Sequence, residues 1–315
     1  MTIVLDGGLA TQLEARGLDL SDRLWSARVL VEDPDAIEAV HRAYFDAGAR
    51  VATTASYQAT VQGFEAAGLD RDAALAAIRR SVALARRARD AHVAAAGADI
   101  DRPLLVAGSV GPYGAMLADG SEYRGDYDPG PDALREVHAP RMDALLEAGA
   151  DLLALETIPT MREAEVLVRL VEERGARAWL TYQCRDEAST AAGEPIADAM
   201  AVAAGSGGIE AVGVNCTAPR LVPHLLAAAA ATAPALARIA YPNAGDRWDA
   251  TAHRWVATSA SEAFDGATVA GWTALGATWL GGCCGTGPAD IAALAAAVTS
   301  AAPAAAPATA GVTER

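Results

Sequence analysis

The chain has 315 residues and a net charge of -15 at pH 7. Hydrophobic residues make up 52% of the chain, but aromatic residues only 5%. Such an acidic surface repels nucleic-acid phosphates and anionic lipids, so a small molecule is the expected ligand, with neither nucleic acid nor membrane as a partner. All 25 residues of the lysine-plus-arginine count are arginine, and the absence of lysine excludes Schiff-base aldolases, pyridoxal-phosphate enzymes and P-loop NTPases.

Short apolar runs alternate along the chain with longer segments of helical periodicity. In chain order, the runs that predict strands are residues 2–5, 50–54, 104–107, 151–155, 178–182, 210–214, 237–241 and 277–280. Predicted helices between them include residues 34–47, 71–94, 131–148, 161–174 and 219–231. Several helices close on Gly-Ala before the next strand, as at Gly48 and Gly149, where glycine commonly follows a helix C-terminus. Eight strand–helix units predict one (β/α)8 TIM barrel over residues 1–300, with a doubly wound open sheet as the alternative.

The first residues and the cysteine count indicate the cellular compartment, and the last residues predict a tail. The first residues lack the basic and apolar regions of a secretory signal, and four cysteines in so long a chain do not make a disulfide framework. A reducing, cytoplasmic compartment is therefore expected. Residues 301–315 are rich in alanine, proline and threonine and predict a disordered tail.

Polar side chains follow the predicted strands. Because the carboxyl ends of barrel strands meet at one rim, these side chains are expected to share a pocket. They are Asp6, Ser56, Tyr57, Ser109, Glu156, Gln183, Cys184, Asn215, Cys216, Asn243, Cys283 and Cys284.

Three of these residues are candidate metal ligands: Cys216 after the sixth strand, and the adjacent Cys283 and Cys284 after the eighth. Three thiolates are one ligand short of a closed tetrahedral zinc site, so a metal held this way keeps an open position for a substrate. Inert buried cysteines or a vicinal disulfide are the alternatives for a Cys-Cys pair. Cys184 is expected to be a small core or rim residue, and no histidine lies where a ligand is expected.

Eight motifs together resemble the homocysteine S-methyltransferase family, and most closely its bacterial and plant enzymes that use S-methylmethionine. They are DGGLATQLE at residues 6–14, LWSA at 24–27, TASYQAT at 54–60, GSVGPYGA at 108–115, ETIP at 156–159, GVNC at 213–216, YPNAG at 241–245 and GGCCG at 281–285. The resemblance covers about residues 3–300. It implies a (β/α)8 barrel with one zinc ion per chain bound by Cys216, Cys283 and Cys284. Ala192 and Asp246 depart from the family pattern and bear on donor preference.

Two carboxylates are the expected anchors of the substrate ammonium group. Asp6 and Glu156 are assigned this role by resemblance and by charge, because an amino-acid substrate carries a cation that two carboxylates can hold. The alternatives are a turn aspartate before Gly7-Gly8 and an acid near a helix N-terminus.

The remaining expected substrate contacts are Gly7, Gly8, Tyr57 and Asn215. The two glycines let the backbone approach the amino-acid carboxylate, although a tight turn explains them equally well. Tyr57 can meet the sulfonium methyl through a cation–π contact, or it can be an ordinary rim aromatic.

The expected reaction is methyl transfer from a sulfonium donor to the thiolate of L-homocysteine, which yields methionine. A sulfonium leaves as a neutral thioether and needs no general acid, whereas the departing amine of methyltetrahydrofolate needs a proton. S-methylmethionine is the first choice of donor and S-adenosylmethionine the second. The alternatives are a same-fold methyltransferase that uses betaine or selenocysteine, and a non-catalytic zinc- or amino-acid-binding barrel.

Overall fold

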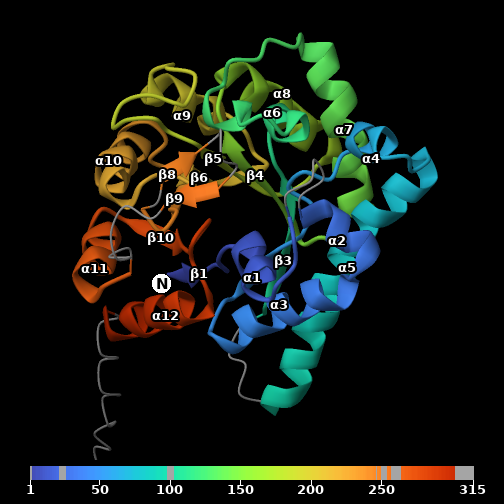
Figure 1. The fold of residues 1–315 in the computed structure, drawn as a ribbon. Helices are drawn as coiled ribbons and strands as arrows, with labels where there is room; N and C mark the ends of the chain where they lie inside the picture. Colours follow the sequence, from blue (N-terminus) through green and yellow to red (C-terminus); the bar gives the residue numbers. More distant parts are fainter. Residues whose placement is uncertain are drawn as a thin grey trace, which may run out of the picture.

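Eight parallel strands form a barrel with helices around its outside in the computed structural model, which describes residues 2–20, 26–97, 103–245, 247–249, 254–256 and 264–301 (Figure 1). The barrel strands are β1 (Ile3–Val4), β2 (Val51–Thr53), β3 (Leu105–Val110), β4 (Leu152–Ile158), β5 (Ala178–Tyr182), β6 (Ile209–Asn215), β7 (Ala237–Tyr241) and β10 (Ala277–Leu280). Each barrel strand pairs with the next one along the chain, in the order β1-β10-β7-β6-β5-β4-β3-β2.

The first and second strands close the barrel. Leu5 and Val51 form a parallel bridge, the Arg50 amide donates to the Val4 carbonyl at 2.7 Å, and the Asp6 amide donates to the Val51 carbonyl at 3.1 Å. An open sheet would leave these two strands as unpaired edges. The predicted TIM barrel is confirmed, and the open-sheet alternative is wrong.

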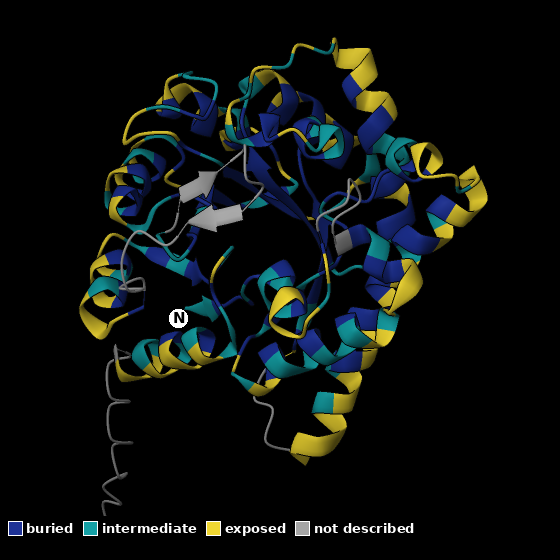
Figure 2. Cartoon of the chain, in the orientation of Figure 1, coloured by how far each residue is buried: buried dark blue, intermediate teal, exposed yellow. Residues whose placement is uncertain are grey.

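The helices lie outside the barrel, with exposed outer faces and buried inner faces (Figure 2). They are α1 (Leu9–Ala15), α2 (Ser26–Glu32), α3 (Pro34–Asp46), α4 (Val61–Ala66), α5 (Arg71–Ala96), α6 (Tyr113–Leu117), α7 (Pro131–Glu147), α8 (Met161–Arg174), α9 (Ile196–Ala204), α10 (Val222–Thr232), α11 (Gly266–Ala274) and α12 (Pro288–Ala301), with 3-10 turns η2 (Ser121–Tyr123) and η3 (Pro219–Leu221). Gly48 and Gly149 follow α3 and α7 with φ of 101° and 87°, the left-handed conformation that glycine adopts without strain. The segment predicted as one helix over residues 219–231 instead begins as η3, and α10 starts at Val222.

Alternation of side chains along the strands produces two apolar cores. Inside the barrel, Leu152 and Ala154 of β4 pack with Trp179 of β5 and with residues of the other strands. Leu153 and Leu155 point the opposite way, into the larger core between barrel and helices. Trp179 also stacks edge-on with Trp279, with ring centroids 5.7 Å apart. This filled interior closes the barrel below the rim, so a ligand is confined to the rim.

Three strands run further than the hydropathy pattern indicates. β3 continues through Ser109, β4 through Glu156, and β6 through Asn215. The hydrogen bonds between strands continue past the last apolar residue, where the hydropathy pattern gives no further sign of a strand. An antiparallel hairpin that was not predicted, β8 (Arg247–Asp249) and β9 (Arg254–Val256), follows β7. Apart from Ala301, the predicted tail lies outside the described residues. In the described part of the chain, no helix combines the length and apolar character needed to cross a bilayer.

Candidate active site

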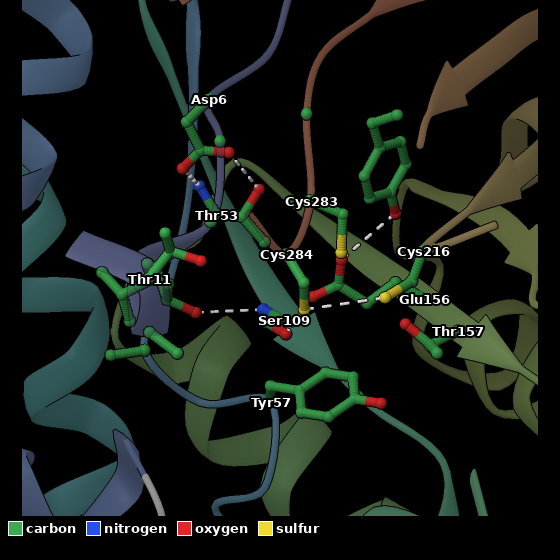
Figure 3. A pocket seen from close by; sticks show the side chains of 18 of the residues that line it. Asp6, Thr11, Thr53, Tyr57, Ser109, Glu156, Thr157, Cys216, Cys283 and Cys284 are labelled. Atoms are coloured by element: carbon green, nitrogen blue, oxygen red, sulfur yellow. Dashed lines mark hydrogen bonds between the residues drawn. The ribbon is translucent and has the colours of Figure 1, made fainter. Parts of the chain in front are cut away.

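A cavity opens at the carboxyl ends of the strands (Figure 3), the place where barrel enzymes bind their substrates. Its walls carry two carboxylates and three thiols, contributed by Asp6, Glu156, Cys216, Cys283 and Cys284. Tyrosine, threonine and serine hydroxyls add to the polar lining. Among the described residues, neither arginine nor histidine lines this cavity. Polar groups far apart in sequence therefore share one pocket, as expected for the rim of a barrel.

The three rim cysteines form a compact cluster. Cys216 follows β6, and Cys283 and Cys284 follow β10; their sulfurs all lie within 4.8 Å of one another. The Cys216 and Cys284 sulfurs are 3.7 Å apart, close to the roughly 3.8 Å between two thiolates on a tetrahedral metal with bonds of about 2.3 Å. All the cysteines are free, so the vicinal-disulfide alternative does not apply. The donor set fits a thiolate-bound metal with one open position.

The loop after β7 holds the two cysteine segments together. The Cys283 amide donates to the Pro242 carbonyl at 2.8 Å, and the Asn243 side-chain amide donates to the Cys216 carbonyl at 3.3 Å. The Cys216 backbone is left-handed, with φ of 47°, which is uncommon for a residue other than glycine. These contacts fix the backbone of both cysteine segments, the kind of preorganisation that a tight metal site requires.

Hydrogen bonding distributes charge unevenly within the cluster. Hydrogen bonds from the Cys283 and Cys284 thiols lower the pKa of Cys216. The same coupling raises the pKa of Cys283 and Cys284, because a second and a third thiolate would meet the charge of the first. A divalent metal removes this repulsion and favours all three thiolates.

Asp6 is buried at the rim against the second strand. One carboxylate oxygen accepts from the Thr53 amide at 2.7 Å, and the other accepts from the Thr53 hydroxyl at 2.9 Å. The side chain is 5% exposed, and burial raises the pKa of Asp6 to about 8. Its partners belong to β2, so the alternative of a turn aspartate is wrong.

Glu156 is the second buried carboxylate of the cavity. Its oxygens accept from the Ser109 hydroxyl and from the Tyr241 hydroxyl at 3.2 Å. Burial is the main cause that raises the pKa of Glu156 to about 7, and Cys283 adds to it. The residue lies within β4, while Thr160 caps α8, so the alternative of a helix-terminal acid is wrong. Two buried carboxylates without a cationic partner in the described lining are suited to a cationic ligand group.

Comparison with known proteins identifies the family. The family model described as homocysteine S-methyltransferase matches residues 3–298. The chain belongs to the homocysteine S-methyltransferase family. It is 48% identical over 303 residues to a homocysteine S-methyltransferase of Escherichia coli, covering 93% of this chain and 94% of the relative. It is 40% identical to a selenocysteine Se-methyltransferase of Brassica oleracea var. italica, covering 92% and 87%.

A solved structure agrees with this assignment. The metallated form of the homocysteine methyltransferase MmuM from Escherichia coli matches with a TM-score of 0.84 at 46% identity, covering 94% of this chain and 96% of that one. The family resemblance, the fold and the enzyme class expected from the motifs are thus confirmed: the protein is a methyltransferase that acts on homocysteine.

Close packing requires small residues at Gly7 and Gly8. A Cβ on Gly7 would lie 2.9 Å from the Tyr44 ring and from the Thr286 hydroxyl, and one on Gly8 would lie 2.7 Å from the Cys283 carbonyl. Gly8 has an ordinary φ of -67°, so small size is the requirement at this position. Both glycines line the cavity, although the Gly8 amide already donates to the Thr286 carbonyl at 3.1 Å and the Gly8 carbonyl accepts from the Tyr44 hydroxyl at 3.0 Å.

We call Tyr57 and Tyr123, two tyrosines of the cavity that lie near Cys216, the tyrosine wall. Both line the cavity, and burial raises the pKa of each, which keeps the phenols neutral. A hydrogen bond from Tyr123 lowers the pKa of Cys216. Tyr123 was not predicted as a site residue, because it lies in η2, well beyond the end of β3. The sequence signal that could have indicated it is its place in the loop after a barrel strand, since such loops supply site residues.

Asn215 stands behind the cavity wall and is absent from its lining. Its side-chain oxygen accepts from the Thr157 amide at 2.6 Å, and its side-chain nitrogen donates to the Thr157 hydroxyl at 2.8 Å. Thr157 has φ of 61°, a strained conformation for a β-branched residue. Asn215 therefore contacts Thr157, where a contact with the substrate was expected, and it holds the backbone next to Glu156 in place.

The other rim positions expected from the strand ends lie outside the lining: Ser56, Gln183, Cys184 and Asn243. Cys184 is buried, 3% exposed, in the larger apolar core, as expected, and it is not part of the cysteine cluster. Of the two departures from the family pattern, Ala192 lies against Gly125, where an added Cβ would be 2.7 Å from that of Ala192. Asp246 lies outside the described residues.

The raised pKa of Asp6 predicts a pH-dependent stability. The pKa rises from an ordinary 3.8 to about 8, so the folded protein keeps a proton that the unfolded chain releases. The free energy of unfolding should therefore fall as pH rises between those values. Asp6→Asn should flatten this slope by up to about 1.4 kcal/mol per pH unit. Urea unfolding of metal-free wild type and variant at about pH 5, 6 and 7 measures the difference, and parallel slopes would contradict the assignment.

Proposed function

We propose that the protein transfers a methyl group from a sulfonium donor to L-homocysteine at one zinc ion held by Cys216, Cys283 and Cys284. The observation that carries this proposal is the pairing of a three-thiol cluster with two buried carboxylates in one cavity. When bound, zinc would lower the pKa of the homocysteine thiol, so that the sulfur reacts as a thiolate at neutral pH. A cytoplasmic location is part of the proposal, since the free thiols suit a reducing compartment.

Asp6 and Glu156 would bind the ammonium group of homocysteine. Each carboxylate is already oriented by neutral donors, Asp6 by Thr53 and Glu156 by Ser109 and Tyr241. A bound ammonium group supplies the missing positive charge and favours ionisation of both acids. Gly7 and Gly8 line the same cavity, and the backbone of this pair would approach the substrate carboxylate.

The tyrosine wall would meet the sulfonium donor. The faces of Tyr57 and Tyr123 attract a cation, and the described lining offers no positive side chain to repel one. The homocysteine sulfur attacks the methyl carbon, and the bond between that carbon and the donor sulfur breaks with its electron pair returning to the donor sulfur. The donor leaves as a neutral thioether, so the step needs no proton.

A donor panel tests the proposed reaction. With homocysteine as acceptor, methionine should form from S-methylmethionine, with S-adenosylmethionine as the second donor to try, and not from 5-methyltetrahydrofolate, whose amine must be protonated as it leaves. Betaine tests the alternative donor class. Selenocysteine is a second acceptor to test, because one relative is a selenocysteine Se-methyltransferase. Turnover with the folate donor and with neither sulfonium would overturn the proposal; zinc and homocysteine binding without turnover would indicate a non-catalytic barrel.

A further inference from the structure

A fully buried triad of polar side chains contacts the segments of the tyrosine wall from outside the cavity. Arg141 and His138 come from α7 and Glu163 from α8, and all three are 0% exposed. A guanidinium nitrogen of Arg141 lies 2.6 Å from His138 Nδ1, and His138 Nε2 lies 2.6 Å from a Glu163 oxygen. A guanidinium can only donate, so Nδ1 accepts and the imidazole proton sits on Nε2, donated to Glu163. A neutral histidine thus connects an arginine to a glutamate.

The arginine end of the triad holds the backbone of Tyr57. Arg141 donates to the Tyr57 carbonyl at 3.3 Å and to the Gly111 carbonyl. Gly111 lies directly against Tyr57, since an added Cβ would be 2.6 Å from the tyrosine ring. One side chain therefore fixes both Tyr57 and the backbone on which its ring rests.

The glutamate end holds the segment that carries the other tyrosine of the wall. Glu163 accepts from the Tyr113 amide at 2.6 Å and from the Tyr127 hydroxyl at 2.5 Å. These two residues bracket residues 113–127, the segment that contains Tyr123, and their rings lie 5.5 Å apart. The segment is thus tied to the same carboxylate near both of its ends.

Packing of α7 on α8 does not by itself call for such a triad. Burying charges costs free energy, and apolar side chains of similar size would stabilise a helix pair as well or better. Outside the triad, the side chain of Arg141 donates to Tyr57 and to the Gly111 backbone against its ring, and the side chain of Glu163 accepts from the segment that carries Tyr123. We propose that the Arg141–His138–Glu163 triad is a positioning device that sets the tyrosine wall against the methyl donor. The donor's place rests on the proposed function above.

Steady-state kinetics of the metal-loaded full-length enzyme test this proposal. Glu163→Gln should raise the KM of S-methylmethionine about tenfold or more, the scale of one hydrogen bond to a charged group. The KM of homocysteine and the metal content should stay close to wild type. Glu173→Gln is the matched control, because this acid lies on the same helix in an exposed ion pair with Arg135. An unchanged donor KM, or an equal rise in both KM values, would overturn the proposal.

Milder variants keep the test decisive where Glu163→Gln does not fold. Tyr127→Phe removes only the hydroxyl that donates to Glu163 and should shift the donor KM in the same direction by less. His138→Gln should restore much of what His138→Leu loses, because an amide can accept from Arg141 and donate to Glu163. Equal KM values of the methyl donor for these two His138 variants would show that His138 does not connect Arg141 to Glu163 in a way that matters for donor binding.

Hydrogen exchange separates this inference from the proposed reaction. In Tyr127→Phe, amides of residues 113–127 should exchange faster while those of α5 and β5 stay protected. If the wild-type enzyme forms no methionine from sulfonium donors, the proposed function is wrong. Hydrogen exchange still tests whether the triad positions residues 113–127. Unchanged exchange in residues 113–127 would overturn the positioning role itself.

Discussion

Cys216→Ser is expected to deprive the enzyme of its metal and to abolish methyl transfer. A serine hydroxyl does not ionise near neutral pH, so only two thiolates would remain of the three whose sulfurs lie within 4.8 Å. Losing a residue that merely orients a ligand already costs about 10- to 100-fold in metal affinity, so losing a ligand should cost more than about 100-fold. Elemental analysis after dialysis and methionine formation, measured on the same preparation, check both effects.

Cys184→Ser is the matched control within the same chain. Cys184 is buried, and burial raises the pKa of its thiol, but its sulfur is outside the cluster. This variant should keep its metal and its activity and lose only some stability. Full metal retention in both Cys216→Ser and Cys283→Ser would show that these cysteines are not the ligands.

The barrel could be predicted because its signals are local. Apolar runs alternate with amphipathic segments, and glycine marks helix ends, as the left-handed Gly48 and Gly149 show. Strand ends were less predictable, because hydropathy stops where polar site residues begin. β4 runs on through Glu156 and Thr157, and its register against β5 shifts between Leu155 and Ile158. That irregularity coincides with the strained Thr157 and has no counterpart in local composition.

The site was predictable only where function and strand position coincide. Cys216 directly follows β6, and Cys283-Cys284 follows β10 after two glycines, so barrel geometry places both segments at the same rim. His138 follows a helical pattern and gives no local sign that its partner is Glu163, 25 positions later. Asn215 illustrates the opposite error, since a polar residue at a strand end was expected to face the substrate, yet its amide is engaged by Thr157.

Glu156→Gln is expected to weaken homocysteine binding while leaving the metal in place. The amide has the shape of the carboxylate and can keep the contacts with Ser109 and Tyr241, so the change removes charge with little disturbance of packing. Loss of one charge-assisted hydrogen bond to the ammonium group costs on the order of 1.5–3 kcal/mol, a rise in KM of about 10- to 100-fold. Asp6→Asn should act in the same direction, since Thr53 can still pair with the amide.

The pH dependence of homocysteine binding gives this prediction a second, independent readout. Glu156 and Asp6 have pKa values raised to about 7 and about 8, so both are partly protonated near neutral pH in the free protein. Because the ammonium group needs the ionised carboxylates, the KM of homocysteine should fall as pH rises through this range, and less steeply in Glu156→Gln. Glu147→Gln, which alters an exposed ion pair with Arg79, should reproduce the wild-type profile. Wild-type KM values and metal content in both Glu156→Gln and Asp6→Asn would instead make the two acids structural, and the ammonium group would have to be held elsewhere in the cavity.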